Sequence, residues 1–153
     1  MMEKILVAVD GSEHSKKALV YAIELTKKFD GKITIVNVYS TVVPQTQPID
    51  GLSTPAMSGT SAALAAKIAE DAKLRGEQVL MEAERSAMEL GVQVEKVLRE
   101  GDAVNEIVAE AKAGNFNLVV VGHRGMSKLR ELLLGGVSEG VSHKVPCPVL
   151  IVK

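Results

Sequence analysis

Glycine is concentrated between positions 121 and 141, where the sequence reads VGHRGMSKLRELLLGGVSEGV. Five of the chain's 13 glycines lie in this window, namely Gly122, Gly125, Gly135, Gly136 and Gly140. A glycine lacks a Cβ atom, so it lets the chain turn tightly or lets a ligand lie against the backbone. Gly135 and Gly136 precede a helical segment, and the free N–H groups at a helix start bind anions well. The glycine loop after Val121 and the helix start after Gly136 would be two backbone concavities, and together they would suit a chain of phosphates.

The second feature that could do chemistry is Asp10, which follows the apolar run KILVAV at positions 4–9. The run is typical of a strand that is buried on both faces. Asp10-Gly11-Ser12 could form only a turn into the next helix, with Ser12 as its N-cap. The loop that begins at Gly122 could likewise be no more than a tight turn. The choice between these interpretations depends on where the two segments lie in the fold.

Two apolar spacings alternate along the chain and predict the elements that carry these segments. Apolar runs rich in β-branched residues predict strands at 4–9, 32–39, 92–99, 117–121 and 147–152. Helical spacing predicts helices at 13–28, 61–90, 103–113 and 129–143. Strands that alternate with helices indicate a parallel sheet with helices on both faces. We therefore expect one doubly wound α/β domain over residues 1–153, with a five-stranded parallel sheet.

The polarity of the strands predicts their order in the sheet. The third strand alternates with polar residues, as an edge strand does, whereas the first and fourth are almost wholly apolar and belong in the centre. The order 3-2-1-4-5 satisfies both conditions with right-handed crossovers. In such sheets a ligand binds outside the carboxyl ends of the strands where the order reverses, here between strands 1 and 4. Asp10 and Gly122 follow those two strands, so we expect both at this crevice.

The composition of the chain narrows the classes of function. The formal net charge is −1, and aromatic residues make up 3% with no Trp, so the sequence offers neither a basic field nor a stacking platform for nucleic acid. No apolar run reaches about 18 residues, and the start, MMEKILVAVDGS, has no signal-peptide core. We therefore expect a cytoplasmic protein without membrane contact.

Residues 40–60 hold three prolines and two glycines and predict a long flexible loop.

Candidates for catalysis are weak. The three histidines, His14, His123 and His143, are scattered and form no His-x-x-x-His metal pair. A triad of Ser12, His123 and Asp10 would need a strained GxSxG turn, which this sequence lacks. The pattern therefore favours a binding site over a hydrolytic one.

Four other residues have a structural interpretation. The single cysteine, Cys147, is interpreted as a small buried hydrophobe. Met81 and Met88 stand at helical spacing and are interpreted as core residues. Asp102 precedes the third predicted helix and is interpreted as its cap, although it could also face the crevice.

The spacing G-x2-G-x9-G is present as Gly122, Gly125 and Gly135. With VAVDGSEHS near the start, LLLGGVSEGV before the last strand and the close CPVLIV, the chain resembles the universal stress protein family over essentially its whole length. The resemblance to the ATP-binding branch implies a site for ATP or another adenine nucleotide. In that site Asp10 would contact the ribose or a phosphate-bound Mg²⁺, and the backbone of Val38 would meet the adenine.

By the same resemblance, the three motif glycines would hold the ribose and the phosphates. The candidate nucleotide-binding residues are Ala8, Val9, Asp10, Val38, Gly122, His123, Arg124, Gly125, Gly135, Gly136, Val137 and Ser138. Arg124 and Lys128 flank the glycine loop and could meet either phosphates or solvent.

One residue departs from the pattern of the ATP-binding branch. That branch has Ser or Thr after the third motif glycine, and this chain has Gly136. The departure removes a hydroxyl expected to contact phosphate, although Ser138 and backbone N–H groups remain. The resemblance also implies a homodimer through the C-terminal strand, which is apolar and lies at a sheet edge in the predicted order.

These observations leave three functional hypotheses. The leading one is a dimeric nucleotide-binding stress-response module that hydrolyses ATP slowly at most. An alternative, favoured by Gly136, is a dimeric stress protein that binds no nucleotide and recruits partners. A third is an ATP-pyrophosphatase-like enzyme, which would need an SGGxDS-type phosphate loop where this chain has VDGSEHS.

Overall fold

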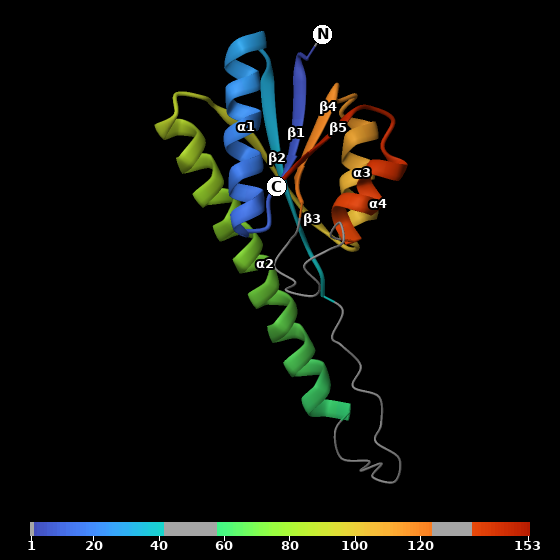
Figure 1. Ribbon diagram of the computed structural model, residues 1–153. Helices are drawn as coiled ribbons and strands as arrows, with labels where there is room; N and C mark the ends of the chain where they lie inside the picture. The colour runs from blue at the N-terminus through green and yellow to red at the C-terminus, as the bar shows by residue number, and fades with distance from the viewer. Residues whose placement is uncertain (1, 42–57, 124–135) are drawn as a thin grey trace.

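The computed structural model describes residues 2–41, 58–123 and 136–153. Within them, strands and helices alternate as the sequence predicts (Figure 1). The strands are β1 (Lys4–Ala8), β2 (Lys32–Tyr39), β3 (Val94–Glu100), β4 (Leu118–Gly122) and β5 (Val149–Val152). The helices are α1 (Glu13–Phe29), α2 (Ser58–Glu89), α3 (Ala103–Ala113) and α4 (Gly136–Lys144). The loop expected at 40–60 and the start expected for the last helix fall largely outside the described residues.

The sheet has the order β3-β2-β1-β4-β5, and every pair of neighbouring strands is parallel. This confirms the predicted doubly wound α/β fold and its strand order. The polar third strand lies at one edge, and β1 lies in the centre, where Ile5, Leu6 and Val7 are fully buried. The order reverses between β1 and β4, because β1 pairs with β2 on one side and with β4 on the other.

Helices cover both faces of the sheet, as Figure 1 shows, and each face has its own apolar core. Ile5 and Val7 of β1 belong to the core that includes residues of α1 and α2. Leu6, on the opposite face, belongs to the core that includes residues of α3 and α4. Because side chains alternate along a strand, β1 needs apolar residues at every position from Ile5 to Val7, which explains its apolar run.

The two predicted helix caps are confirmed. The Ser12 side chain accepts a hydrogen bond from the Ser15 amide at the start of α1. The Asp102 carboxylate accepts one from the Asn105 amide at the start of α3, at 2.9 Å. Each cap satisfies one of the backbone donors that a helix start leaves unpaired.

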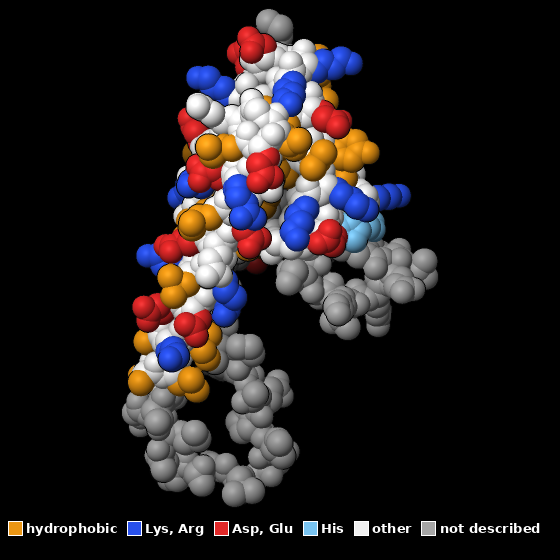
Figure 2. Space-filling view, turned by 90° about the vertical axis from the view of Figure 1, so that its left-hand side faces the viewer, with side chains coloured by type: hydrophobic (Ala, Val, Ile, Leu, Met, Phe, Trp, Pro, Cys, Tyr) orange, Lys and Arg blue, Asp and Glu red, His pale blue; other side chains and the backbone are white. Residues whose placement is uncertain are grey.

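The interpretation of Met81 and Met88 as core residues is wrong, because each is 63% exposed. The buried face of α2 runs instead through Leu80, Ala83 and Ala87. Residues seven positions apart lie on the same face of a helix, but that face can be buried or exposed. The spacing alone therefore could not show which face of α2 lies against the sheet. Figure 2 looks onto this side of the molecule and shows charged side chains of both signs interspersed over it.

Candidate functional site

The carboxyl ends of β1 and β4 lie side by side and form the expected switch-point crevice. Val7 pairs with Val120, so Val9 and Gly122 stand at the same height where the two strands end. Asp10 follows on one side and His123 on the other. The fold therefore brings together the two segments, more than a hundred residues apart in sequence, that were singled out for their chemistry.

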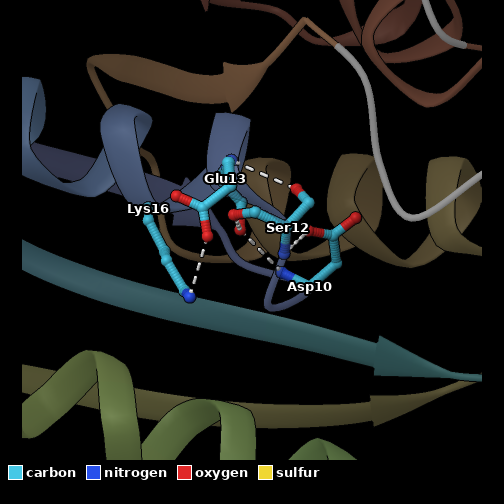
Figure 3. Close-up of polar contacts among 5 residues, drawn as sticks. Asp10, Ser12, Glu13 and Lys16 are labelled. Carbon is cyan, nitrogen blue, oxygen red and sulfur yellow. Dashed lines mark hydrogen bonds and ion pairs between the residues drawn. The ribbon is translucent and has the colours of Figure 1, made fainter.

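Asp10 is held in a small hydrogen-bonded turn at the entrance to α1 (Figure 3). Its Oδ1 accepts a hydrogen bond from the Ser12 amide at 2.9 Å, and its own amide donates to Ser15 Oγ at 3.3 Å. Gly11 has a φ of 82°, which favours glycine. Among the described residues, the other carboxylate oxygen of Asp10 has no partner, and Figure 3 shows it pointing away from the turn. The carboxylate thus has one oxygen left for a ligand.

Gly122 lies tightly against the first turn of α1. A Cβ atom added there would lie 2.7 Å from the carbonyl carbon of His14 and 2.9 Å from the amide nitrogen of Ser15. Those atoms are backbone and cannot move without shifting the helix. The glycine is therefore required by the packing of β4 on α1, whether or not a ligand also approaches it.

His123 and Ser138 join the end of β4 to α4. Ser138 is 2% exposed, and its hydroxyl donates to the His123 carbonyl at 3.0 Å. The His123 amide donates to the carbonyl of Val152 in β5. The His123 ring lies 6.2 Å from the ring of His14, centroid to centroid, at an interplanar angle of 57°. The fold therefore pairs two histidines that the sequence shows only as scattered.

Gly136 is the first residue of α4 and has space around it. Among the described residues, a Cβ atom added at Gly136 meets nothing within 4 Å. Val137 follows and is 38% exposed. Three of the predicted site residues, Arg124, Gly125 and Gly135, lie outside the described residues.

The remaining candidates line the β1–β2 side of the crevice. Val9 is buried in the core beneath α1 and α2, whereas the side chain of Ala8 packs against the core on the other face. β2 continues past the end of β1, since its pairing with β1 ends at Val36 and its pairing with β3 goes on to Tyr39. Val38 therefore lies on a stretch of β2 whose neighbour on the crevice side has ended.

A cavity of about 280 Å³ lies behind this region, between α1 and α2. Val9, Gly11 and Ser15 form its wall toward the crevice. Apolar side chains such as Leu19 and Val79 line it further in. None of its described lining residues belongs to β4.

The described residues show little that would support catalysis. Within them, no group of three or more His, Cys, Asp or Glu side chains could hold a metal ion. Burial raises the pKa of the Cys147 thiol, which disfavours the thiolate that a nucleophile needs. Cys147 is only partly buried but packs against the apolar core beneath α3 and α4, close to the interpretation from the sequence.

None of the described helices combines the length and apolar character needed to cross a membrane.

Sequence reasoning missed two residues near the crevice. Asn37 is buried in β2, and its side-chain amide donates to the Val9 carbonyl at 2.8 Å. Gly76, in the interior of α2, lies directly against Asn37. A lone Asn in an apolar strand was the one available signal, since apolar strands seldom bury an amide without a partner for it.

Comparison with known proteins identifies the family. Residues 1–153 match the model of the universal stress protein family, and the chain belongs to that family. It is 37% identical to the universal stress protein YxiE of Bacillus subtilis over the full length of both chains. It is 35% identical to the universal stress protein MJ0531 of Methanocaldococcus jannaschii, covering 100% of this chain and 83% of that one.

Solved structures share the fold. A universal stress protein crystallised in complex with cAMP has a TM-score of 0.68 to this chain at 27% identity. The similarity covers 99% of this chain and 97% of that one.

Proposed function

We propose that this chain is a nucleotide-binding stress-response protein of the cytoplasm that takes ATP, ADP or AMP in the crevice between β1 and β4. The observation that carries the proposal is the carboxylate oxygen of Asp10 that has no partner among the described residues, at the switch point of the sheet. The cAMP complex of a family member with the same fold supports an adenine nucleotide as the ligand.

Each side of the crevice has a role in this proposal. Asp10 accepts hydrogen bonds from ribose hydroxyls or binds a phosphate-bound Mg²⁺, since carboxylate and phosphate oxygens are the ligands that Mg²⁺ prefers. The Val38 backbone pairs with the edge of the base. Gly122 and the start of α4, including Ser138, accommodate ribose and phosphates.

The first experiment is to purify the protein under native conditions and to identify any co-purified small molecule by mass spectrometry. Calorimetric titration of ligand-free protein with ATP, ADP, AMP and GTP then tests the class of ligand. We expect adenine nucleotides to bind and ATP to be hydrolysed slowly at most. A protein that binds none of ATP, ADP and AMP contradicts the proposal.

We also propose that the protein is a homodimer through β5. This strand is at the edge of the sheet, and Val149, Leu150 and Ile151 are each only partly buried in the single chain. An apolar strand edge of this kind invites pairing with another chain. Light scattering at micromolar concentration tests this, and we expect Ile151→Lys to weaken the dimer. A strict monomer of the wild-type protein contradicts it.

Gly136 supports a second candidate, a dimeric stress protein that binds no nucleotide and recruits partners. The residue offers no hydroxyl where the ATP-binding branch of the family has one. The same titrations separate the candidates, because this alternative requires a wild-type dimer with no affinity for any of the four nucleotides.

A further inference from the structure

The pairing between β1 and β2 ends in an unusual way. The Val9 amide donates to the Val36 carbonyl at 2.9 Å, which is a regular step of a parallel ladder. In such a ladder the next bond would run from the Val38 amide to the Val9 carbonyl. In the described part of the chain, the side-chain amide of Asn37 takes that position and donates to the Val9 carbonyl at 2.8 Å.

Asn37 is fixed in this position by α2. Its side chain is 6% exposed, so the amide lies in the core, away from water. A Cβ atom added at Gly76 of α2 would lie 2.6 Å from Asn37 Oδ1 and 2.9 Å from a methyl carbon of Leu98. Either the Asn37 side chain or α2 would have to shift to make room for such an atom. Glycine at position 76 therefore lets α2 approach the sheet while Asn37 keeps its place.

The part of β2 beyond β1 stays extended because β3 holds its other side. Val38 stands opposite Arg99, and the Gly101 amide donates to the Tyr39 carbonyl at 2.9 Å. The Tyr39 hydroxyl also bonds to Glu100, at 3.2 Å. In an extended strand the N–H and C=O of one residue point to the same side, and successive residues alternate. Since Val36 faces β1, the peptide groups of Val38 face the crevice.

We propose that Asn37 and Gly76 are positioning residues that end the β1–β2 ladder and so leave the Val38 backbone available to a nucleotide base. This inference rests on the proposed function. The Asn37 amide satisfies the Val9 carbonyl, so that β1 can stop without leaving a buried acceptor unpaired. Val38 then offers one donor and one acceptor side by side, which match the acceptor and donor on the hydrogen-bonding edge of adenine.

The first test needs no ligand and no variant. Amide hydrogen exchange, measured by NMR on the wild-type protein, compares Val38 with Val36, which is paired with β1. We expect the Val38 amide to exchange at least about tenfold faster, as a backbone donor outside the ladder should. Equal protection of the two amides overturns the inference, because the ladder would then continue to Val38.

The second test removes the side-chain donor. Asn37→Leu keeps a side chain that branches at Cγ and leaves the Val9 carbonyl without its partner. We expect the Val38 amide to take that place and its exchange to slow toward that of Val36. Gly76→Ala, which crowds Asn37 from α2, should change the exchange of Val38 in the same direction. If both variants fold and neither alters it, the inference is wrong.

Binding measurements separate positioning from a general loss of stability. We expect Asn37→Leu to weaken adenosine binding about tenfold, the effect of losing one good hydrogen bond, and to leave binding of inorganic triphosphate unchanged. Thr34→Val is the matched control, since Thr34 is also a buried polar residue of β2, bonded to Glu95 at 3.4 Å and remote from the crevice. This control should leave both affinities unchanged. Equal losses for adenosine and triphosphate in Asn37→Leu would overturn the positioning role.

The two proposals fail in different ways. A wild-type protein that binds no adenosine refutes the proposed function and the use of Val38 by a base. The exchange rates of Val38 and Val36 still decide whether Asn37 ends the ladder. Conversely, adenosine binding that survives Asn37→Leu unchanged leaves the nucleotide function intact and refutes only the role of Asn37.

Discussion

The turn that follows β1 and the turn that follows β3 both lead a strand into a helix, and both contain an aspartate and a glycine with positive φ. Gly11 has a φ of 82° and Gly101 a φ of 143°. After β3, the carboxylate of Asp102 itself caps α3. After β1, Ser12 caps α1, and Asp10 only braces the turn through one oxygen.

The difference separates a structural aspartate from a candidate ligand. Asp102 carries out the capping that its helix needs and lies at the end of an edge strand. Asp10 precedes a helix that already has a cap, and it lies beside the reversal of strand order. Asp10 is not needed as a helix cap and lies beside the reversal of strand order, so it is the better candidate for binding a ligand. Three sets of variants test this comparison.

The largest effect is expected at a third helix start, that of α4. Gly136→Ser adds a hydroxyl that can donate to a phosphate, and we expect triphosphate binding to tighten by about 1.5 to 3 kcal/mol. Gly136 has no positive φ and, among the described residues, no atom lies within 4 Å of an added Cβ, so serine should fit. Titrations of the wild-type protein and of Gly136→Ser with ATP and with adenosine measure the effect. Adenosine, which lacks phosphates, is the control. Equal gains for both ligands would mean that the residue lies away from the phosphates.

The next effect concerns Asp10 directly. Asp10→Ala should weaken nucleotide binding by about 1 to 3 kcal/mol, because a charged hydrogen-bond partner is lost. Asp102→Ala is the matched control and should leave the affinity unchanged. Calorimetry on both variants makes the comparison. Unchanged affinity in Asp10→Ala would reduce this residue to the same structural role as Asp102.

The smallest effect is on stability. Ser12→Ala and Asp102→Ala should each lower the free energy of unfolding by about 1 kcal/mol, since each removes a helix cap. Asp10→Ala should cost less than either, because Ser12 still caps α1. Urea denaturation of the three variants measures these differences. A loss in Asp10→Ala larger than in Ser12→Ala would show that the turn depends on Asp10 more than on the cap.

The sequence was sufficient to predict the strand order, both caps and the convergence of Asp10 with Gly122. These features follow from the polarity of whole strands and from local turn chemistry, which one sequence displays. The roles of Asn37, Gly76 and the His14–His123 pair were not predictable in the same way. Each depends on contacts between elements distant in sequence, and even the lone Asn in an apolar strand signals only that its amide has a partner, not which one.

Gly122 shows a different limit. Its lack of a side chain was interpreted either as space for a ligand or as a tight turn, and the structure adds a third reason, because a Cβ atom there would clash with the backbone of α1. Both explanations require glycine, so the residue type alone could not distinguish them. The error over Met81 and Met88 has a related origin, because their spacing fits a helix face without saying which face is buried.

The central position of β1 has a consequence for how the chain folds. β1 pairs with β2 within the first forty residues, but its other edge pairs with β4, and Asn117 accepts a bond from the Lys4 amide across 113 positions of sequence. During synthesis, β1, whose residues Ile5, Leu6 and Val7 are fully buried in the folded protein, therefore keeps one edge unpaired until more than three quarters of the chain has been made. Contacts of such high sequence separation slow folding and lengthen exposure to aggregation. We expect refolding to be slow for a chain of this size and sensitive to protein concentration.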